Sequence, residues 1–107
     1  MINKIIINEK PLVICDIGAS PIDPTPFIDE LIKNVNCFLY GFEPNEEEFK
    51  KLTSTDKKKY FNYAVGNDQM ETLNICAAPG MTSILEPDFE YLKLFHGLSD
   101  WAKIKKK

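Results

Sequence analysis

Two short apolar runs, each followed closely by an acidic residue, stand out in the first half of the chain. One run has the sequence LVIC before Asp16, and the other is CFLYGF before Glu43. Uninterrupted apolar runs of this length, rich in Leu, Val and Ile, are typical of parallel strands that are buried on both faces. We therefore predict strands over Leu12–Asp16 and Cys37–Phe42, with an acid at the carboxyl end of each.

A helical pattern lies between the two predicted strands. Pro21, Pro24 and Pro26 prevent a helix before the last of them, and Pro26 suits the first helical position with Thr25 as the N-cap. Apolar residues then recur at helical spacing until about Asn34. The residues of this predicted inward face are Phe27, Ile28, Leu31, Ile32 and Val35.

A strand, a helix and a second strand of these lengths predict one β-α-β crossover. Such crossovers place consecutive parallel strands side by side or nearly so, so Asp16 and Glu43 should lie close together at one edge of the sheet. Ligands of open α/β sheets bind outside the carboxyl ends of the strands. Gly18, Ala19 and Ser20 form a small-residue turn at this edge. The sequence therefore predicts a small-molecule site here.

The chain beyond Glu43 predicts shorter elements. Asn45 can cap a helix, with Glu48 completing a capping box, so Glu46–Glu48 are expected on a solvated helix start. A third strand is predicted over Tyr60–Val65, because the segment is aromatic and alternating.

The last third of the chain predicts an antiparallel hairpin and one helix. Glu71–Cys76 is expected as a strand, and Thr82–Leu85 as a short strand that pairs back onto it. A helix is expected from Asp88, with Gly97 as its C-terminal stop.

Composition places the protein among small globular domains. We divide its 107 residues into an ambiguous lead-in over 1–11, a folded region over 12–100 and a basic tail over 101–107. Ile5–Ile7 could form a short edge strand in the lead-in, and the tail is expected to be solvated and frayed. A net charge of −3 gives no reason to expect nucleic acid as a partner.

Membrane and metal functions are not indicated either. No apolar run approaches the roughly 20 residues that a spanning helix needs. The chain has three cysteines without CxxC spacing and a single histidine, so no zinc cluster is expected. Cys15 and Cys37 fall in predicted strands and are expected to be buried, reduced thiols. These features fit a cytoplasmic protein.

Four motifs, in this order, resemble the N-terminal part of the FkbM-type S-adenosylmethionine-dependent methyltransferases. They are CDIGAS, GFEPN, NYAVGN and PGMTSILEPD. The resemblance implies an α/β, Rossmann-like methyltransferase sheet in truncated form, with three parallel strands, an appended hairpin and flanking helices. It also implies S-adenosylmethionine as cofactor and methyl transfer to a hydroxyl of a small-molecule acceptor such as a sugar.

The same resemblance implies roles for individual residues. Asp16 and the turn of Gly18, Ala19 and Ser20 would approach the methionine part of the cofactor. Glu43, beside Pro44, would bind the ribose hydroxyls, since a carboxylate offers two acceptor oxygens to two adjacent donors. The segment after the third strand would lie near the adenine, and its residues are Ala64, Val65 and Gly66.

The chain also departs from the family pattern. It has Pro21 and Pro24 where a fuller glycine motif would carry another glycine, and it ends before the part of the family that would supply catalytic residues, so none is assigned. Without a further strand beside it, Leu12–Asp16 is expected to be an exposed apolar edge, so that the isolated chain either self-associates through this strand or is marginally stable.

Two other function classes remain open. A nicotinamide- or flavin-dependent oxidoreductase would need a GxGxxG motif to bring a pyrophosphate to the helix start, and this motif is missing. A non-catalytic module or a fragment of the same fold is also compatible with the chain. In either case Asp16 and Glu43 could be ordinary acids that cap a turn or precede a helix, and Gly18 and Gly66 ordinary turn glycines.

Overall fold

The computed structural model of the protein describes residues 10–107. The chain divides into two compact units, Met1–Val65 and Gly66–Lys107, and each is described by itself below. Together the elements make a mixed α/β protein, with a three-stranded parallel sheet in the first unit and an antiparallel strand pair in the second. The possible strand at Ile5–Ile7 and most of the predicted lead-in lie outside the described residues.

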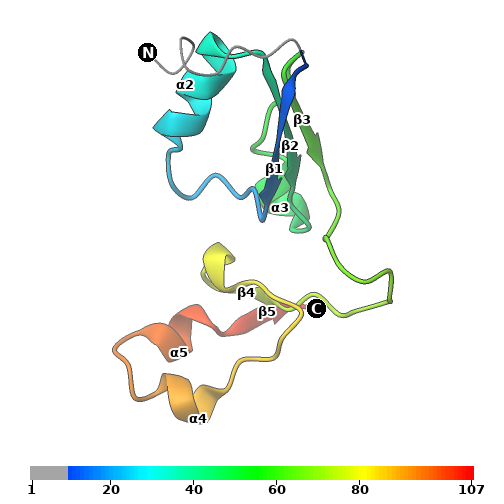
Figure 1. The fold of residues 1–107 in the computed structure, drawn as a ribbon. Coiled ribbons are helices and arrows are strands. Elements are labelled where there is room, and N and C mark those ends of the chain that lie inside the picture. The colour runs from blue at the N-terminus through cyan, green and yellow to red at the C-terminus, as the bar shows by residue number, and fades with distance from the viewer. Residues whose placement is uncertain (1–9) are drawn as a thin grey trace. The chain divides into compact units, whose positions relative to one another are not determined.

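The first unit alternates strands and helices. Its elements are β1 (Leu12–Ile17), α2 (Pro26–Asn34), β2 (Cys37–Phe42), α3 (Glu46–Phe49) and β3 (Lys58–Phe61), as Figure 1 shows. The strands are parallel and lie in the order β1-β2-β3. The predicted bounds of α2 are confirmed, although the Thr25 side chain makes no capping hydrogen bond.

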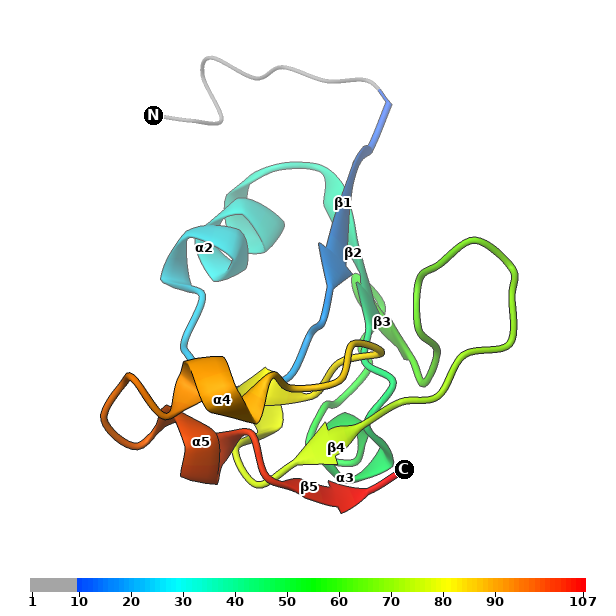
Figure 2. The same cartoon turned by 90° about the horizontal axis from the view of Figure 1, so that it is seen from below.

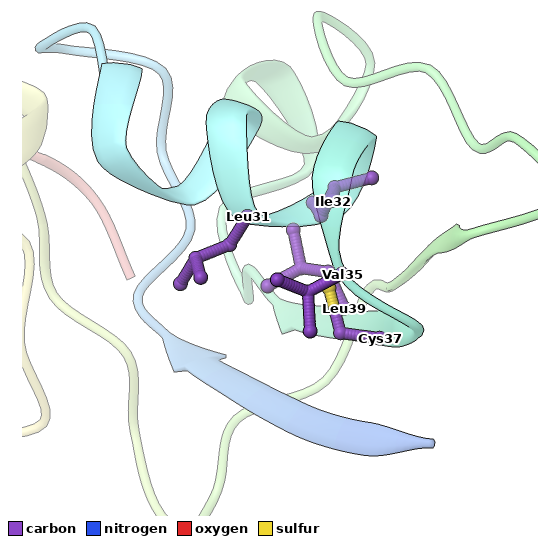
Figure 3. Close-up of a cluster of buried hydrophobic side chains, with 5 residues drawn as sticks. All are labelled: Leu31, Ile32, Val35, Cys37 and Leu39. Atoms are coloured by element: carbon purple, nitrogen blue, oxygen red, sulfur yellow. The ribbon is translucent and has the colours of Figure 1, made fainter. Parts of the chain in front are cut away.

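The core of the first unit lies between α2 and the sheet. Its buried residues are Leu31, Ile32, Val35, Cys37 and Leu39. Figure 3 shows the side chains from α2 and the following segment beside those of β2. The helix lies to the same side of β1 and β2 in both ribbon views (Figures 1 and 2). Phe27, predicted to face inward, is instead 61% exposed, because it lies on the outer side of the first turn.

The prediction that β1 is buried on both faces is wrong. Val13 and Ile17 are 53% and 67% exposed, and Cys15 is exposed as well, contrary to the buried thiol predicted. The reason is that Val13, Cys15 and Ile17 lie on the sheet face opposite α2, whereas Ile14 lies on the other face and packs against the core. Cys37 is fully buried, as predicted, because β2 is the central strand.

The third strand begins and ends earlier than the predicted Tyr60–Val65. It runs over Lys58–Phe61 and pairs with β2 in parallel, with Phe61 opposite Phe42. The last hydrogen bond of this ladder joins the Glu43 amide to the Phe61 carbonyl at 3.0 Å. Amides of a parallel strand face the same neighbour at every second residue, so the next donor on this side is the Asn45 amide, which bonds to the Glu43 carboxylate instead and ends the ladder.

The second unit is built around a short strand pair. Its elements are β4 (Ile75–Cys76), the 3-10 helix η1 (Pro79–Met81), α4 (Phe89–Leu92), α5 (Leu98–Trp101) and β5 (Ile104–Lys106). β4 and β5 are antiparallel. Asp88 caps α4 by accepting from the Tyr91 amide at 3.2 Å, which confirms the predicted helix start.

Four sequence-based expectations for the second unit need correction. The helix predicted from Asp88 to a C-terminal stop at Gly97 ends at Leu92, and Gly97 is instead the N-cap of α5. The strand predicted over Glu71–Cys76 is limited to its last two residues. Its hairpin with Thr82–Leu85 is reduced to a single bridge between Asn74 and Ser83, because the next donor on that side, the Cys76 amide, bonds to the Thr82 hydroxyl rather than to a backbone carbonyl. The basic tail over 101–107 is not frayed, since Ile104 in it is opposite Cys76.

None of the helices in residues 10–107 has the length and apolar character needed to cross a membrane.

Candidate functional site

The carboxyl ends of β1 and β2 lie side by side, as the crossover pattern predicted. Asp16 is opposite Gly41, and Ile17 is opposite Phe42. The Phe42 carbonyl accepts hydrogen bonds from the amides of both Gly18 and Ala19, at 2.9 and 3.0 Å. Gly18 has a φ of +77°, a backbone conformation that is unfavourable for any residue with a side chain. The sharp turn predicted here is therefore present.

Gly41 is required at this edge for a different reason. A Cβ atom added to it would meet the Tyr60 ring, lying 2.6 Å from Cε1, and would be 3.1 Å from the Ala19 Cβ. The glycine therefore lets the ring of β3 and the turn after β1 pack directly over β2. The sequence analysis placed Gly41 in a strand but gave it no role.

A cavity of about 410 Å³ lies beside these strand ends within the first unit. Asp16, Ala19 and Ser20 line it from β1 and the following turn, and Tyr60 lines it from β3. Its lining includes three carboxylates and one ammonium group. The carboxylates belong to Asp16, Asp23 and Asp29, and the ammonium group belongs to Lys58. The charge of the lining therefore favours a ligand that carries positive charge.

Lys58 and Asp29 form an ion pair at the cavity, 2.7 Å between Nζ and Oδ1. The hydrogen bond from Lys58 is the main cause that lowers the pKa of Asp29, and it raises the pKa of Lys58 in return. This pair joins α2 to β3. The sequence analysis did not find it, because partners on different elements leave no spacing signal.

Glu48 links α3 to the turn after β1. Its Oε2 accepts from the Ser20 hydroxyl at 2.9 Å, and its Oε1 accepts from Lys51 Nζ at 2.6 Å. Glu48 is buried, so its expected place on a solvated face is wrong. The bond from Lys51, followed by the one from Ser20, holds the pKa of Glu48 below its ordinary value of 4.5 despite this burial.

The predicted capping box around α3 is half correct. Asn45 does cap the helix, by accepting from the Glu47 amide at 3.1 Å. The acid that accepts from the Asn45 amide is Glu43, at 2.9 Å, rather than Glu48. Glu48 makes the bonds to Ser20 and Lys51 instead, because the turn after β1 packs against this helix.

Glu43 is the most enclosed of the predicted ligand-binding side chains, with 5% of its surface exposed. Its backbone is fixed by Asn62, whose Nδ2 donates to the carbonyls of Glu43 and Pro44 at 2.9 and 3.2 Å. A carboxylate has about four acceptor positions, so the bond from Asn45 leaves Glu43 able to accept others. Glu43 is not among the residues that line the cavity with Asp16.

The structure brings together part of the predicted site. The residues at the adjacent ends of β1 and β2 are Asp16, Gly18, Ala19, Ser20, Glu43 and Pro44. Ala64 and Val65 follow the end of β3 and are exposed, and Gly66 belongs to the second unit.

The described residues hold no cluster of three or more His, Cys, Asp or Glu side chains that could bind a metal ion. The second unit has a smaller cavity of about 270 Å³, lined mainly by apolar side chains such as Met81 and Leu92. Asn74 is almost fully buried in this unit, and its Oδ1 has no hydrogen-bond partner there.

Comparisons with protein-family models, with curated proteins and with solved structures found no match for this chain.

Proposed function

We propose that the protein binds S-adenosylmethionine at the carboxyl ends of β1 and β2, as the cofactor-binding part of a methyltransferase with a Rossmann-like sheet. The observation that carries the proposal is that the Gly18 turn and Glu43 directly follow the paired ends of two adjacent parallel strands, where the Phe42 carbonyl accepts from the Gly18 amide. Ligands of open α/β sheets bind at this position. The acceptor would be a hydroxyl group of a small molecule.

The charge of the cavity supports this choice of ligand. S-adenosylmethionine carries a sulfonium and an ammonium group, and the cavity is lined by more carboxylates than ammonium groups. Asp16 lies in this lining at the end of β1, where it would accept from the ammonium group. A volume of about 410 Å³ is within the range of small-molecule sites, about 300–1,000 Å³.

Glu43 would accept hydrogen bonds from the ribose hydroxyls. Its carboxylate is held in place by the Asn45 amide, so binding would not have to order a flexible side chain. The chemistry itself would need little more than positioning, because the sulfonium activates the methyl group and the acceptor oxygen displaces it in line.

A nicotinamide dinucleotide suits this site less well. Its pyrophosphate would have to sit at a helix start free of negative charge. Asp23 precedes α2 and Asp29 lies in its first turn, and both line the cavity. These carboxylates would repel a pyrophosphate.

We place the protein in the cytoplasm as part of this proposal. Its three cysteines, at positions 15, 37 and 76, form no disulfide. Free thiols are typical of reducing compartments.

Calorimetric titration of the purified chain tests the proposal, with S-adenosylmethionine, S-adenosylhomocysteine and NADH as separate ligands. Saturable binding is expected for the first two, with tighter binding of S-adenosylmethionine because it alone carries the sulfonium charge. Binding of NADH alone would contradict the proposal, and so would the absence of binding to a folded chain.

Two variants test the assigned carboxylates. Glu43→Gln and Asp16→Asn keep the shape of each side chain and remove its charge, and each should weaken binding at least about tenfold. Asp56→Asn is the matched control, since Asp56 is an exposed acid of the same unit that does not line the cavity. Equal binding by all three variants would refute the assignment.

A further inference from the structure

The outer edge of β1 is open in the described part of the chain. β1 is the first strand in the order β1-β2-β3, and among residues 10–107 its one strand neighbour is β2. The strand is six residues long and its side chains are apolar apart from Asp16. The side chains of Val13, Cys15 and Ile17 are exposed on the sheet face opposite α2, next to this open edge.

The hydrogen-bond pattern shows which backbone groups this edge offers. The amides of Leu12 and Gly18 both donate to the β2 side, to the carbonyls of Asn36 and Phe42. Bonds of a parallel ladder recur at every second residue, so the even-numbered residues of β1 face β2. The backbone groups of Val13, Cys15 and Ile17 therefore point outward, away from β2.

The other strand edges of the protein are protected in ways that β1 is not. β3 forms the opposite edge of the same sheet, has four residues and begins with Lys58 and Lys59. β4 has two residues, and β5 has three, of which two are lysines. Short length and lysine side chains are common devices that prevent edges from pairing. β1 has neither of them, and it lacks proline and bulges as well.

We propose that two copies of this chain pair through β1, antiparallel and about a two-fold axis at Cys15. In this register Cys15 is opposite its own copy and Val13 is opposite Ile17 of the second copy. About six backbone hydrogen bonds would join the outward groups, and the two three-stranded sheets would become one continuous sheet. The proposal does not depend on the ligand proposed above.

A second copy fits this edge better than the other described strands do. An edge of six apolar residues needs a partner strand of similar length and character, and β1 itself is the one open strand of that kind in residues 10–107. The two-fold register also avoids a direct charge clash. Asp16 would be opposite Ile14 of the second copy, whereas like charges directly opposite each other are destabilising.

Sedimentation of the reduced protein across a series of concentrations tests the proposal, together with oxidative cross-linking. We expect a reversible monomer–dimer equilibrium and a disulfide-linked dimer formed through Cys15. Directly opposite Cα atoms in an antiparallel pair are about 5.5 Å apart, within the range that a disulfide spans. The cross-link should be absent in Cys15→Ser, because Cys37 and Cys76 are buried.

Two variants probe the edge itself. Cys15→Pro removes an outward amide and leaves the hydrogen bonds between β1 and β2 intact. Cys15→Lys places two ammonium groups opposite each other in the dimer. Each variant should raise the dimer dissociation constant at least about tenfold. Phe27→Lys is the matched control, an exposed apolar residue on α2, and should not change it. A monomer at all concentrations, a dimer indifferent to both Cys15 variants, or a dimer without the cross-link would overturn the proposal.

Discussion

Replacing Gly41 by alanine adds one methyl group at the point where the sheet meets the turn after β1. The new carbon would lie 2.6 Å from the Tyr60 Cε1 and 3.1 Å from the Ala19 Cβ, whereas carbon atoms pack best at about 3.5–4.0 Å. Relief requires the Tyr60 ring to move into the cavity or the turn to move away from β2. Overpacking of this kind costs about 1–3 kcal/mol, and the two-sided contact places the expected loss near the upper end.

Two other glycines supply a scale for this measurement. Gly18→Ala meets no atom within 4 Å but forces alanine to a φ of +77°, for an expected loss of about 1–2 kcal/mol. Gly66→Ala has open space and no positive φ, so it should be neutral or stabilising by up to about 1 kcal/mol. Urea denaturation followed by circular dichroism gives the free energy of unfolding for each variant.

A Gly41→Ala variant that is as stable as Gly66→Ala would contradict the expected overpacking at Gly41. A double variant provides the internal check. Adding Tyr60→Ala to Gly41→Ala removes the ring, so the additional cost of the new methyl group should largely disappear in that background. A cost that persists unchanged would mean that the contact with Tyr60 is not its cause.

Three further predictions concern the surroundings of the site. Glu48→Gln should lower the free energy of unfolding by about 1–2 kcal/mol at neutral pH. Because the pKa of Glu48 is held below 4.5, its contribution is present above that pH and lost as pH falls through the lowered value, so acid denaturation curves of the variant should be less steep there. A thiol reagent should label Cys15 rapidly, and Cys37 and Cys76 only on unfolding, since both are buried and burial raises the pKa of Cys76. Asn62→Ala should cost about 1–2 kcal/mol, measured by urea denaturation, through its two lost bonds to the backbone after β2.

The elements with a strong local signal could be predicted from the sequence. The apolar run of β2 and the proline that opens α2 each determine structure through their own residues, and both elements have the predicted bounds. The end of β3 depends on where its partner β2 stops, before Pro44, and nothing within Tyr60–Val65 records that. The lysine-rich β5 was missed for a similar reason, because its pairing with β4 outweighs its composition.

The candidate site shows the same division. The positive φ of Gly18 follows from a turn signal, and the side-by-side ends of β1 and β2 follow from a crossover rule. The burial of Glu48 could not be predicted, because its partner Ser20 is distant in sequence. The local capping pattern predicts that Glu48 accepts from the Asn45 amide, whereas in the structure Glu43 accepts from it.

The proposed ligand binds where β1 and β2 end. Titration of the ¹⁵N-labelled chain with S-adenosylhomocysteine, followed by amide chemical shifts, tests this most directly. We expect saturable shifts concentrated in Asp16–Ser20 and Glu43–Asn45, reduced in Glu43→Gln. Shifts confined to Gly66–Lys107, or none from a folded chain, would contradict it.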